Sequence, residues 1–237
     1  MRVIACLAAS LDGKISPAHV ERYTRITTDV DIQHLCRLRD TVQAVVYGGN
    51  TFRAYPKKHR GLDLDRTLHH VILTRGQNIV QDLPIDAPLF QENQIPIWIF
   101  IPQLPSIDTQ AAYPDHVQWR AIDSFEIPGE PAKVILNTLA QAGLESIMVE
   151  GGGEVVTQFL KAQAIQELYL TLSPLFLGNQ AAGLTGNGNF PFAFPQIPQA
   201  KLLSVQQLEN ELYLHYQLAY ETSWPIVESE AEDGFSN

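Results

Sequence analysis

The stretch Ile147-Met-Val-Glu-Gly-Gly-Gly-Glu-Val-Val-Thr-Gln-Phe-Leu160 indicates a strand, a glycine turn and a helix in immediate succession. Residues 147–149 form a short apolar run typical of a buried strand, and apolar residues then recur at helical spacing as far as Leu160. The free N–H groups at the start of a helix bind anions, and glycines let a phosphate approach them closely. The turn is therefore either a pyrophosphate site or a plain strand-to-helix connection.

The triple glycine does not decide between these two interpretations by itself. It differs from the dinucleotide fingerprint G-x-G-x-x-G, and no Gly-Lys-Ser or Gly-Lys-Thr follows it. A lone run of glycines is commonly a flexible turn. The decision depends on the other motifs along the chain.

Length and composition favour one large globular domain. The chain has 237 residues, of which 45% are hydrophobic, and we place the domain at 1–222 with an acidic, disordered tail at 223–237. A net charge of −10 excludes general affinity for nucleic acid or anionic membranes. No apolar segment is long enough to span a bilayer, and no signal peptide is expected. Cys6 and Cys36 are expected to be reduced thiols, which fits a cytoplasmic protein.

Apolar runs alternate with helical patterns along most of the chain. This order predicts an α/β fold with a mostly parallel central sheet and a C-terminal antiparallel hairpin. Helices are expected at 32–39, at 131–144 and after the glycine turn, with loops at 77–96 and 179–199. Strands are expected at 3–9, 44–47, 69–73, 97–101, 116–122, 147–149 and 167–174, and the hairpin at 202–208 and 212–220 around Glu209-Asn210.

Two further polar segments follow predicted strands. Arg53-Ala-Tyr-Pro-Lys-Lys-His-Arg60 carries four basic residues and no acidic one, and it is either a solvated loop or a phosphate-binding loop. Thr74 and Arg75 come directly after the strand at 69–73. A hydroxyl beside an arginine at the carboxyl end of a strand suits the 2′-phosphate of NADP.

A resemblance to a known family connects these segments. The motifs Ala8-Ala-Ser-Leu-Asp-Gly-Lys14, Arg37-Leu-Arg39, Gly48-Gly-Asn-Thr51, Leu73-Thr-Arg75, Val149-Glu-Gly-Gly-Gly-Glu154 and Glu167-Leu-Tyr-Leu-Thr171 occur in this order. Their sequence and spacing resemble the dihydrofolate-reductase-like superfamily, and within it the reductase domain of riboflavin biosynthesis. The resemblance covers residues 3 to about 220 and implies the three-layer α/β fold of that superfamily.

The resemblance implies NADPH as the cofactor. Backbone groups of Ala8 would contact the nicotinamide, and Gly48 and Thr51 would hold the cofactor phosphates. Thr74 and Arg75 would bind the 2′-phosphate. The pyrophosphate would lie against the glycine turn at Gly152, Gly153, Glu154 and Val155.

The resemblance also implies a small phosphorylated pyrimidine as the substrate. Arg39 would reach the substrate, Glu150 would accept hydrogen bonds from the pyrimidine, and Lys57 and Arg60 would hold the ribose phosphate. The implied reaction is hydride transfer to C1′ of an opened ribosyl group, for which the sequence identifies no general acid. A homodimer without nucleic-acid or membrane partners is implied as well. No zinc-deaminase motif of the H-x-E and P-C-x-x-C type occurs, so a reductase unfused to a deaminase is expected.

Two segments depart from the family pattern. Tyr23-Thr-Arg-Ile26 stands where the family usually has Ser-x-Trp-Ile, and Ala54-Tyr-Pro56 stands where it usually has Ala-Asp-Asp-Pro. The second change removes an aspartate that contacts substrate in the family. Three functions are therefore compatible with the sequence: the riboflavin-pathway pyrimidine reductase, a reductase of the same fold acting on another substrate such as a pterin, and a nucleotide-binding protein without turnover.

Overall fold

A computed structural model describes residues 1–18, 24–76, 78–186, 192 and 197–220. The tail predicted at 223–237 lies outside these residues, as does much of the loop predicted at 179–199. No helix in the described part of the chain is long and apolar enough to cross a membrane.

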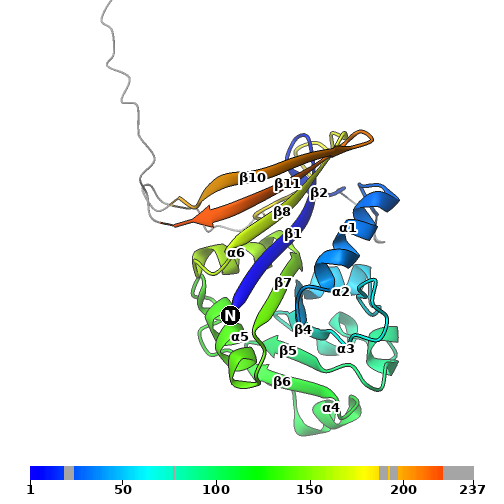
Figure 1. Ribbon diagram of the computed structural model, residues 1–237. Helices are drawn as coiled ribbons and strands as arrows, with labels where there is room; N and C mark the ends of the chain where they lie inside the picture. The colour runs from blue at the N-terminus through cyan, green and yellow to red at the C-terminus, as the bar shows by residue number, and fades with distance from the viewer. Residues whose placement is uncertain (19–23, 77, 187–191, 193–196, 221–237) are drawn as a thin grey trace, which may run out of the picture.

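A nine-stranded sheet forms the centre of the described structure, in the order β10-β11-β8-β1-β7-β3-β4-β5-β6 (Figure 1). Neighbouring strands from β8 to β6 pair in parallel, whereas β11 pairs antiparallel with both β8 and β10. The strands are β1 (Arg2–Ser10), β3 (Ala44–Gly48), β4 (His69–Leu73), β5 (Ile97–Ile101), β6 (Val117–Ala121), β7 (Ser146–Gly151), β8 (Glu167–Ser173), β10 (Gln199–Leu208) and β11 (Glu211–Ala219). The mostly parallel sheet with its C-terminal hairpin confirms the predicted fold class.

Helices cover both faces of this sheet, which gives three layers (Figure 1). On one face α5 (Glu130–Gln141) and α6 (Gly153–Lys161) pack through Ile135, Leu139 and Phe159, all completely buried. The other face carries α1 (Asp29–Arg39), α2 (Gly49–Ala54), α3 (Ile79–Asp82), the 3₁₀ helix η1 (Pro88–Gln91) and α4 (Ile107–Ala112). Strands buried on both faces read as continuous apolar runs, which explains the pattern of β3 and β5 in the sequence.

Several short helices and strands were not predicted from the sequence. The segment 77–96, which we predicted as a loop, contains α3 and η1, and α4 was not predicted at all. The same holds for a small ribbon of β2 (Lys14–Ser16) and β9 (Ala182–Gly183). Each is at most six residues long, and so short a segment shows too little periodicity to be recognised.

The turn after β1 is tied to the segment after β8 by the aspartate of the Ser-Leu-Asp-Gly motif. Asp12 accepts hydrogen bonds from the Ser10 hydroxyl at 2.5 Å and from the backbone N–H groups of Leu177 and Gly178 at 3.1 and 2.7 Å. These donors lower the pKa of Asp12 to about 2. Asp12 thus connects two segments that lie far apart in the sequence.

Candidate functional site

Parallel pairing brings three predicted cofactor segments together at one edge of the sheet. Gly48 at the end of β3 lies opposite Leu73 in β4, and Tyr47 lies opposite Gly151 in β7. Helices α2 and α6 begin directly after β3 and β7. The carboxyl ends of parallel strands, with helix N-termini beside them, are the usual ligand edge of an open α/β sheet.

No side chain covers the backbone at Gly152. Its φ is +75°, a conformation that side chains disfavour. A Cβ added at Gly152 would make ordinary van der Waals contacts, 3.7 Å from Thr51 Oγ1, 3.8 Å from Val155 Cγ2 and 3.9 Å from the Gly48 nitrogen. Gly48, Thr51 and Gly152 therefore lie close together, and a side chain at position 152 would contact the other two residues.

Gly153 packs closely against the backbone of another segment of the chain, at Gly183 and Gly186. A Cβ at Gly153 would lie 2.1 Å from the Gly186 nitrogen and 2.6 Å from the Gly183 oxygen. Thr157, one turn further along α6, donates a hydrogen bond to the backbone oxygen of Thr185 at 2.6 Å. The segment 183–186 thus packs against the first turns of α6, which gives Gly153 a packing role that the sequence did not reveal.

The two residues after Gly153 have different surroundings. Glu154 is exposed, and its backbone nitrogen lies 2.9 Å from a Cβ added at Gly186. Val155 is buried, and its Cγ2 lies 3.2 Å from a Cβ added at Gly48. The Val155 side chain is used for packing, so only its backbone could face a cofactor.

Thr74 and Arg75 lie at the end of β4. Thr74 is buried, and its Oγ1 lies 2.7 Å from a Cβ added at Gly49, which explains the second glycine of that motif. Arg75 is half exposed, pairs with Glu126 and lies over the ring of Phe125. An open hollow of about 400 Å³ adjoins it, lined by Arg75, Gly76, Ile79, Pro102, Gln103, Leu104 and Pro105.

Ala8 lies near the end of β1, the strand next to β7. It lies in β1 opposite Thr171 of β8 and is half buried. Because β1 is the neighbour of β7, Ala8 borders the same carboxyl edge on the side of the C-terminal hairpin.

Arg39 and Glu150 form a buried, doubly hydrogen-bonded ion pair. Arg39 Nε donates to Glu150 Oε1 at 2.8 Å and Arg39 Nη2 donates to Oε2 at 2.7 Å, and the two side chains are 11% and 5% exposed. Burial alone would raise the pKa of Glu150, but the Arg39 charge and the contact with His59 outweigh it and hold this pKa far below its ordinary value. The carboxylate is therefore ionised, and it already accepts bonds on both oxygens.

His59 completes this pair, and the sequence analysis did not identify it. Its side chain is 4% exposed, and Nδ1 lies 2.7 Å from Glu150 Oε2. The imidazole stacks on the Tyr47 ring with centroids 4.5 Å apart, and the Tyr47 hydroxyl lies 2.8 Å from His70 Nδ1. Burial raises the pKa of Tyr47 and lowers that of His70, so both side chains are neutral. Because Glu150 lies 91 residues along the chain from His59, no local sequence pattern predicts their contact.

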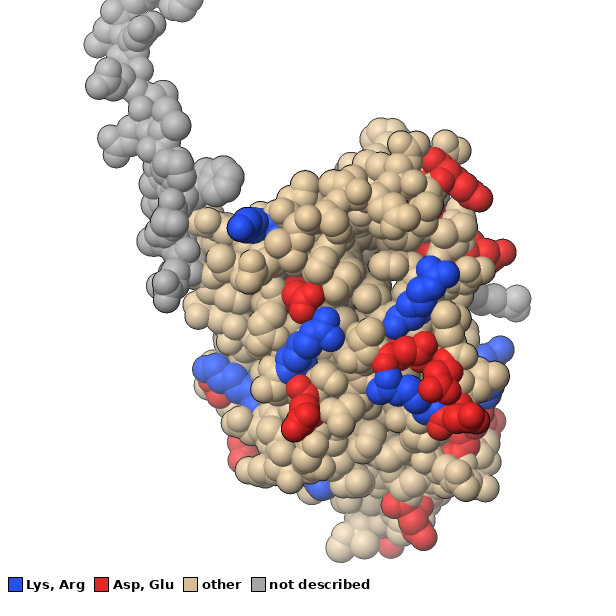
Figure 2. All heavy atoms as spheres, viewed as in Figure 1, with Lys and Arg blue, Asp and Glu red and all other residues tan. Residues whose placement is uncertain are grey.

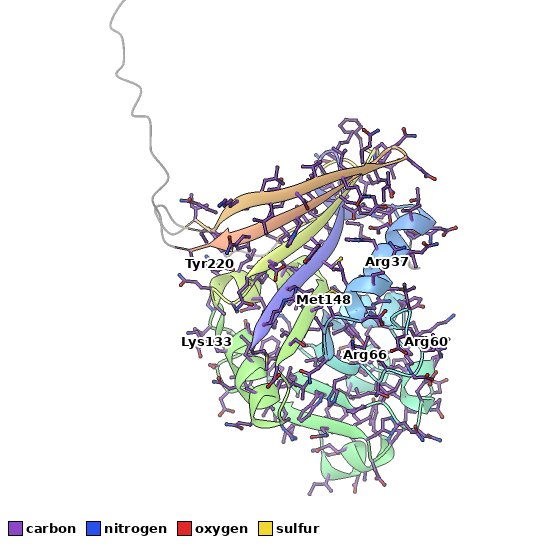
Figure 3. All side chains as sticks on the ribbon, in the orientation of Figure 1. Arg37, Arg60, Arg66, Lys133, Met148 and Tyr220 are labelled. Atoms are coloured by element: carbon purple, nitrogen blue, oxygen red, sulfur yellow. The ribbon has the colours of Figure 1, made fainter. Side chains whose placement is uncertain are left out.

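The basic loop does not gather its charges in one place. Arg53 pairs with Asp82 at 2.8 Å, and Arg60 pairs with Glu92 at 3.4 Å. Lys57 is exposed, and Figure 3 places Arg60 at the margin of the molecule. The backbone oxygen of Arg60 nevertheless accepts a bond from Arg39 Nη1 at 3.1 Å, which fixes the end of the loop beside the buried pair.

No cluster of three or more His, Cys, Asp or Glu side chains that could hold a metal occurs among the residues that the structure describes. Cys6 is buried and Cys36 half buried, and both are free thiols. Burial, followed by the nearby charges of Asp31 and Glu150, raises the pKa of Cys6 well above its ordinary value, so this thiol is protonated and unreactive.

A mostly parallel sheet with a C-terminal antiparallel hairpin, and a glycine turn at its carboxyl edge, is the α/β architecture of pyrimidine reductase domains. More particularly, the family model of the RibD C-terminal domain matches residues 1–214, and the chain belongs to this family. It is 26% identical over 211 residues to the riboflavin biosynthesis protein RibD of Bacillus amyloliquefaciens, covering 87% of this chain and 54% of that protein. The chain thus spans about half the length of this relative.

Solved structures show the same fold. One is a diaminohydroxyphosphoribosylaminopyrimidine deaminase/5-amino-6-(5-phosphoribosylamino)uracil reductase from Thermotoga maritima, with a TM-score of 0.72 and 21% identity, covering 92% of this chain and 56% of that one. Another is the riboflavin biosynthesis reductase Rib7 of Saccharomyces cerevisiae, with a TM-score of 0.64 and 20% identity, covering 92% and 90%.

Proposed function

We propose that this chain is an NADPH-dependent reductase of riboflavin biosynthesis, which converts the ribosyl group of a phosphoribosylamino-pyrimidine to a ribityl group. The observation that carries the proposal is the grouping of Gly48, Thr51 and Gly152 at the carboxyl edge, in a chain of the RibD C-terminal domain family. Because Gly152 has no side chain, a phosphate of the dinucleotide could approach the Thr51 hydroxyl and the Gly48 nitrogen directly.

The cofactor would lie along the carboxyl edge of the sheet. Gly48, Thr51 and the backbone from Gly152 to Val155 would hold its pyrophosphate, and Ala8 would border the nicotinamide. Thr74 and Arg75 would bind the 2′-phosphate beside the hollow of about 400 Å³. When bound, the cofactor supplies a hydride, and the protein has to position the acceptor carbon in a site that excludes water.

The substrate would lie on the α1 side of the sheet. The Arg39–Glu150 pair would form the wall of its pocket, and Lys57 and Arg60 would hold the phosphate. The exposed position of Lys57 and the long, solvent-exposed contact of Arg60 with Glu92 support this role, because exposed ion pairs are weak and readily exchanged.

A second candidate is a reductase of the same fold that acts on another substrate, such as a pterin. The specific observation in its favour is that both Glu150 oxygens are engaged by Arg39 and His59. A pyrimidine that needs this acceptor would have to displace one of them. The lost aspartate at Tyr55-Pro56 favours the same alternative.

We also propose a cytoplasmic homodimer. Leu202, Leu203 and Val205 on β10 are 48%, 47% and 52% exposed at the end of the sheet, where a second copy could cover them.

Genetic rescue tests the proposed function. A riboflavin-requiring strain that lacks only the pyrimidine reductase should grow without riboflavin when it expresses this chain. Expression of the Gly152→Ala variant provides the matched control. Absence of growth despite soluble, NADPH-binding protein would favour the second candidate.

A further inference from the structure

We propose that His59 is the proton donor that opens the ribose ring before hydride transfer. The inference rests on the reductase function proposed above. It concerns a residue of the basic loop, three positions after the segment Ala54-Tyr-Pro56 where this chain departs from the family pattern, and it supplies the general acid that the sequence did not identify.

The contact with Glu150 fixes which nitrogen of His59 is free. An ionised carboxylate only accepts hydrogen bonds, so the 2.7 Å contact between Nδ1 and Glu150 Oε2 requires a hydrogen on Nδ1. Arg39 Nη2 also lies 3.2 Å from Nδ1, but as a donor it cannot share a hydrogen bond with a protonated nitrogen. Proton gain and loss therefore occur at Nε2. A carboxylate behind an imidazole is the arrangement that orients a histidine acid or base and stabilises its cation.

Nε2 is the atom of this contact network that is left for a ligand. It is buried and has no hydrogen-bond partner among the described residues, and such an atom calls for a specific explanation. The groups that face the ring are Glu150 from β7, Arg39 from α1, Tyr47 from β3, His70 from β4 and Tyr55 from its own loop. His70 also has an unpartnered Nε2, but burial lowers its pKa well below the ordinary value, so its imidazole is neutral and cannot act as a cationic acid.

The proposed reaction consumes one proton at a defined atom. The C1′–O4′ bond of the ribosyl group breaks, O4′ takes the proton from Nε2, and the lone pair of the exocyclic nitrogen forms the C1′=N bond of an iminium ion. The hydride then adds to C1′ and gives a neutral secondary amine. NADPH is oxidised, C1′ is reduced, and His59 regains its proton from solvent.

The position of His59 in the chain matches this role. It stands between Lys58 and Arg60 in the loop that we assign to the substrate phosphate. In a ribose 5-phosphate, O4′ is only a few bonds from the phosphorus. A loop that holds the phosphate through Lys57 and Arg60 therefore brings the side chain between them close to O4′.

The test uses two variants and one control. In His59→Asn the amide nitrogen takes the place of Nδ1 and keeps the bond to Glu150, but no atom replaces Nε2. His59→Gln is the second variant if the first does not fold. His116→Asn is the matched control, since His116 also has a buried, unpartnered Nε2 but precedes β6, at the far end of the sheet. The measurements are the kcat of phosphoribosylamino-pyrimidine reduction from pH 5 to 9, and the affinity for NADPH by fluorescence titration.

We expect His59→Asn to lower kcat by roughly 10²- to 10⁴-fold, the usual contribution of general acid catalysis. Any fall of kcat at alkaline pH in the wild type should disappear, while NADPH affinity and the His116→Asn control stay at wild-type values. Unchanged kcat, or a reduced kcat that keeps the alkaline fall, would overturn the proton-donor role. A wild-type protein that binds NADPH but gives no turnover would instead overturn the proposed function, and this inference with it.

Discussion

Glu150 is the centre of a buried cluster, because Arg39 and His59 both contact its carboxylate. Removing one partner of such a pair leaves the other as an uncompensated charge in a dry environment, which costs about 3–5 kcal/mol. The cluster therefore has to be treated as a structural unit as well as part of a site.

Glu150→Gln should lower the free energy of unfolding by about 3–5 kcal/mol at pH 7. The folded-state pKa of Glu150 is depressed below its ordinary value of 4.5, so its stabilising contribution is complete above 4.5 and is lost as the pH falls below that value. The difference between wild type and variant in urea unfolding should therefore shrink between pH 5 and pH 3. Glu145→Gln, at an exposed position before β7, is the control. An equal difference at pH 7 and pH 3 would contradict the assigned pKa.

Arg75→Ala should weaken NADPH binding by about ten- to a hundredfold, because a hydrogen bond between charged groups contributes about 1.5–3 kcal/mol. NADH affinity should not change, since NADH has no 2′-phosphate. Glu126→Gln removes the acid that competes for Arg75 and should strengthen NADPH binding. Fluorescence titration measures the affinities of the wild type and of both variants for NADPH and NADH. If Arg75→Ala lost the same affinity for NADPH and for NADH, Arg75 would not bind the 2′-phosphate.

The sequence led to Arg39, Thr51, Glu150 and Gly152 through motifs, but it did not reveal how they pair. We predicted Arg39 and Glu150 as separate substrate contacts, whereas the structure joins them to each other. The contacts of His59 with Tyr47 and Glu150 arise only when the loop folds back over the sheet. Tertiary contacts of this kind leave no periodic pattern in the chain.

Long, strongly patterned elements were predictable, and their order determines where the site lies. The strands β1, β3, β4 and β5 occur within a residue or so of their expected bounds. Helix α5 begins at Glu130 and ends at Gln141, three residues before the expected end, because Gly143 adopts a φ of +85°. The glycine turn before α6 combines two different constraints: a positive φ at Gly152, and packing at Gly153 too close for any side chain.

Gly152→Ala should abolish most NADPH binding without unfolding the protein. The new Cβ would occupy the space beside Thr51 and Gly48, and contact between an anion and a helix N-terminus is worth up to about 2 kcal/mol, or roughly thirtyfold in affinity. Gly143→Ala is the matched control, because Gly143 also has a positive φ but no atom within 4 Å of its Cβ position. Both variants should lose about 1–2 kcal/mol of stability. If NADPH raised the melting temperature of Gly152→Ala as much as that of the wild type, the turn would have a structural role only.

The distribution of charge over the surface agrees with a small-molecule enzyme. On the face shown in Figure 2, Lys and Arg side chains lie among Asp and Glu side chains and form no continuous basic area. With a net charge of −10, any affinity for a phosphorylated substrate has to come from local groups such as the basic loop. The apolar side chains exposed on β10 lie at the opposite end of the sheet from β6 (Figure 1).

Val205→Lys should shift the protein from dimer to monomer if β10 forms the interface, because Val205 is 52% exposed and a buried lysine would lose its hydration. Val80→Lys is the control on α3, where Val80 is 70% exposed. Sedimentation equilibrium gives the mass of each protein. A wild-type monomer, or a Val205→Lys protein that remains dimeric, would exclude this interface.

The most direct test of the central claim follows the hydride itself. The protein is incubated with a phosphoribosylamino-pyrimidine and NADPH that carries deuterium at the transferred position of nicotinamide C4, and the product is analysed by mass spectrometry. We expect a ribitylamino-pyrimidine with one deuterium at C1′, formed in equal amount to the NADP⁺ released. Oxidation of NADPH without deuterium at C1′, or no product despite tight cofactor binding, would contradict the assignment of this chain as a pyrimidine reductase.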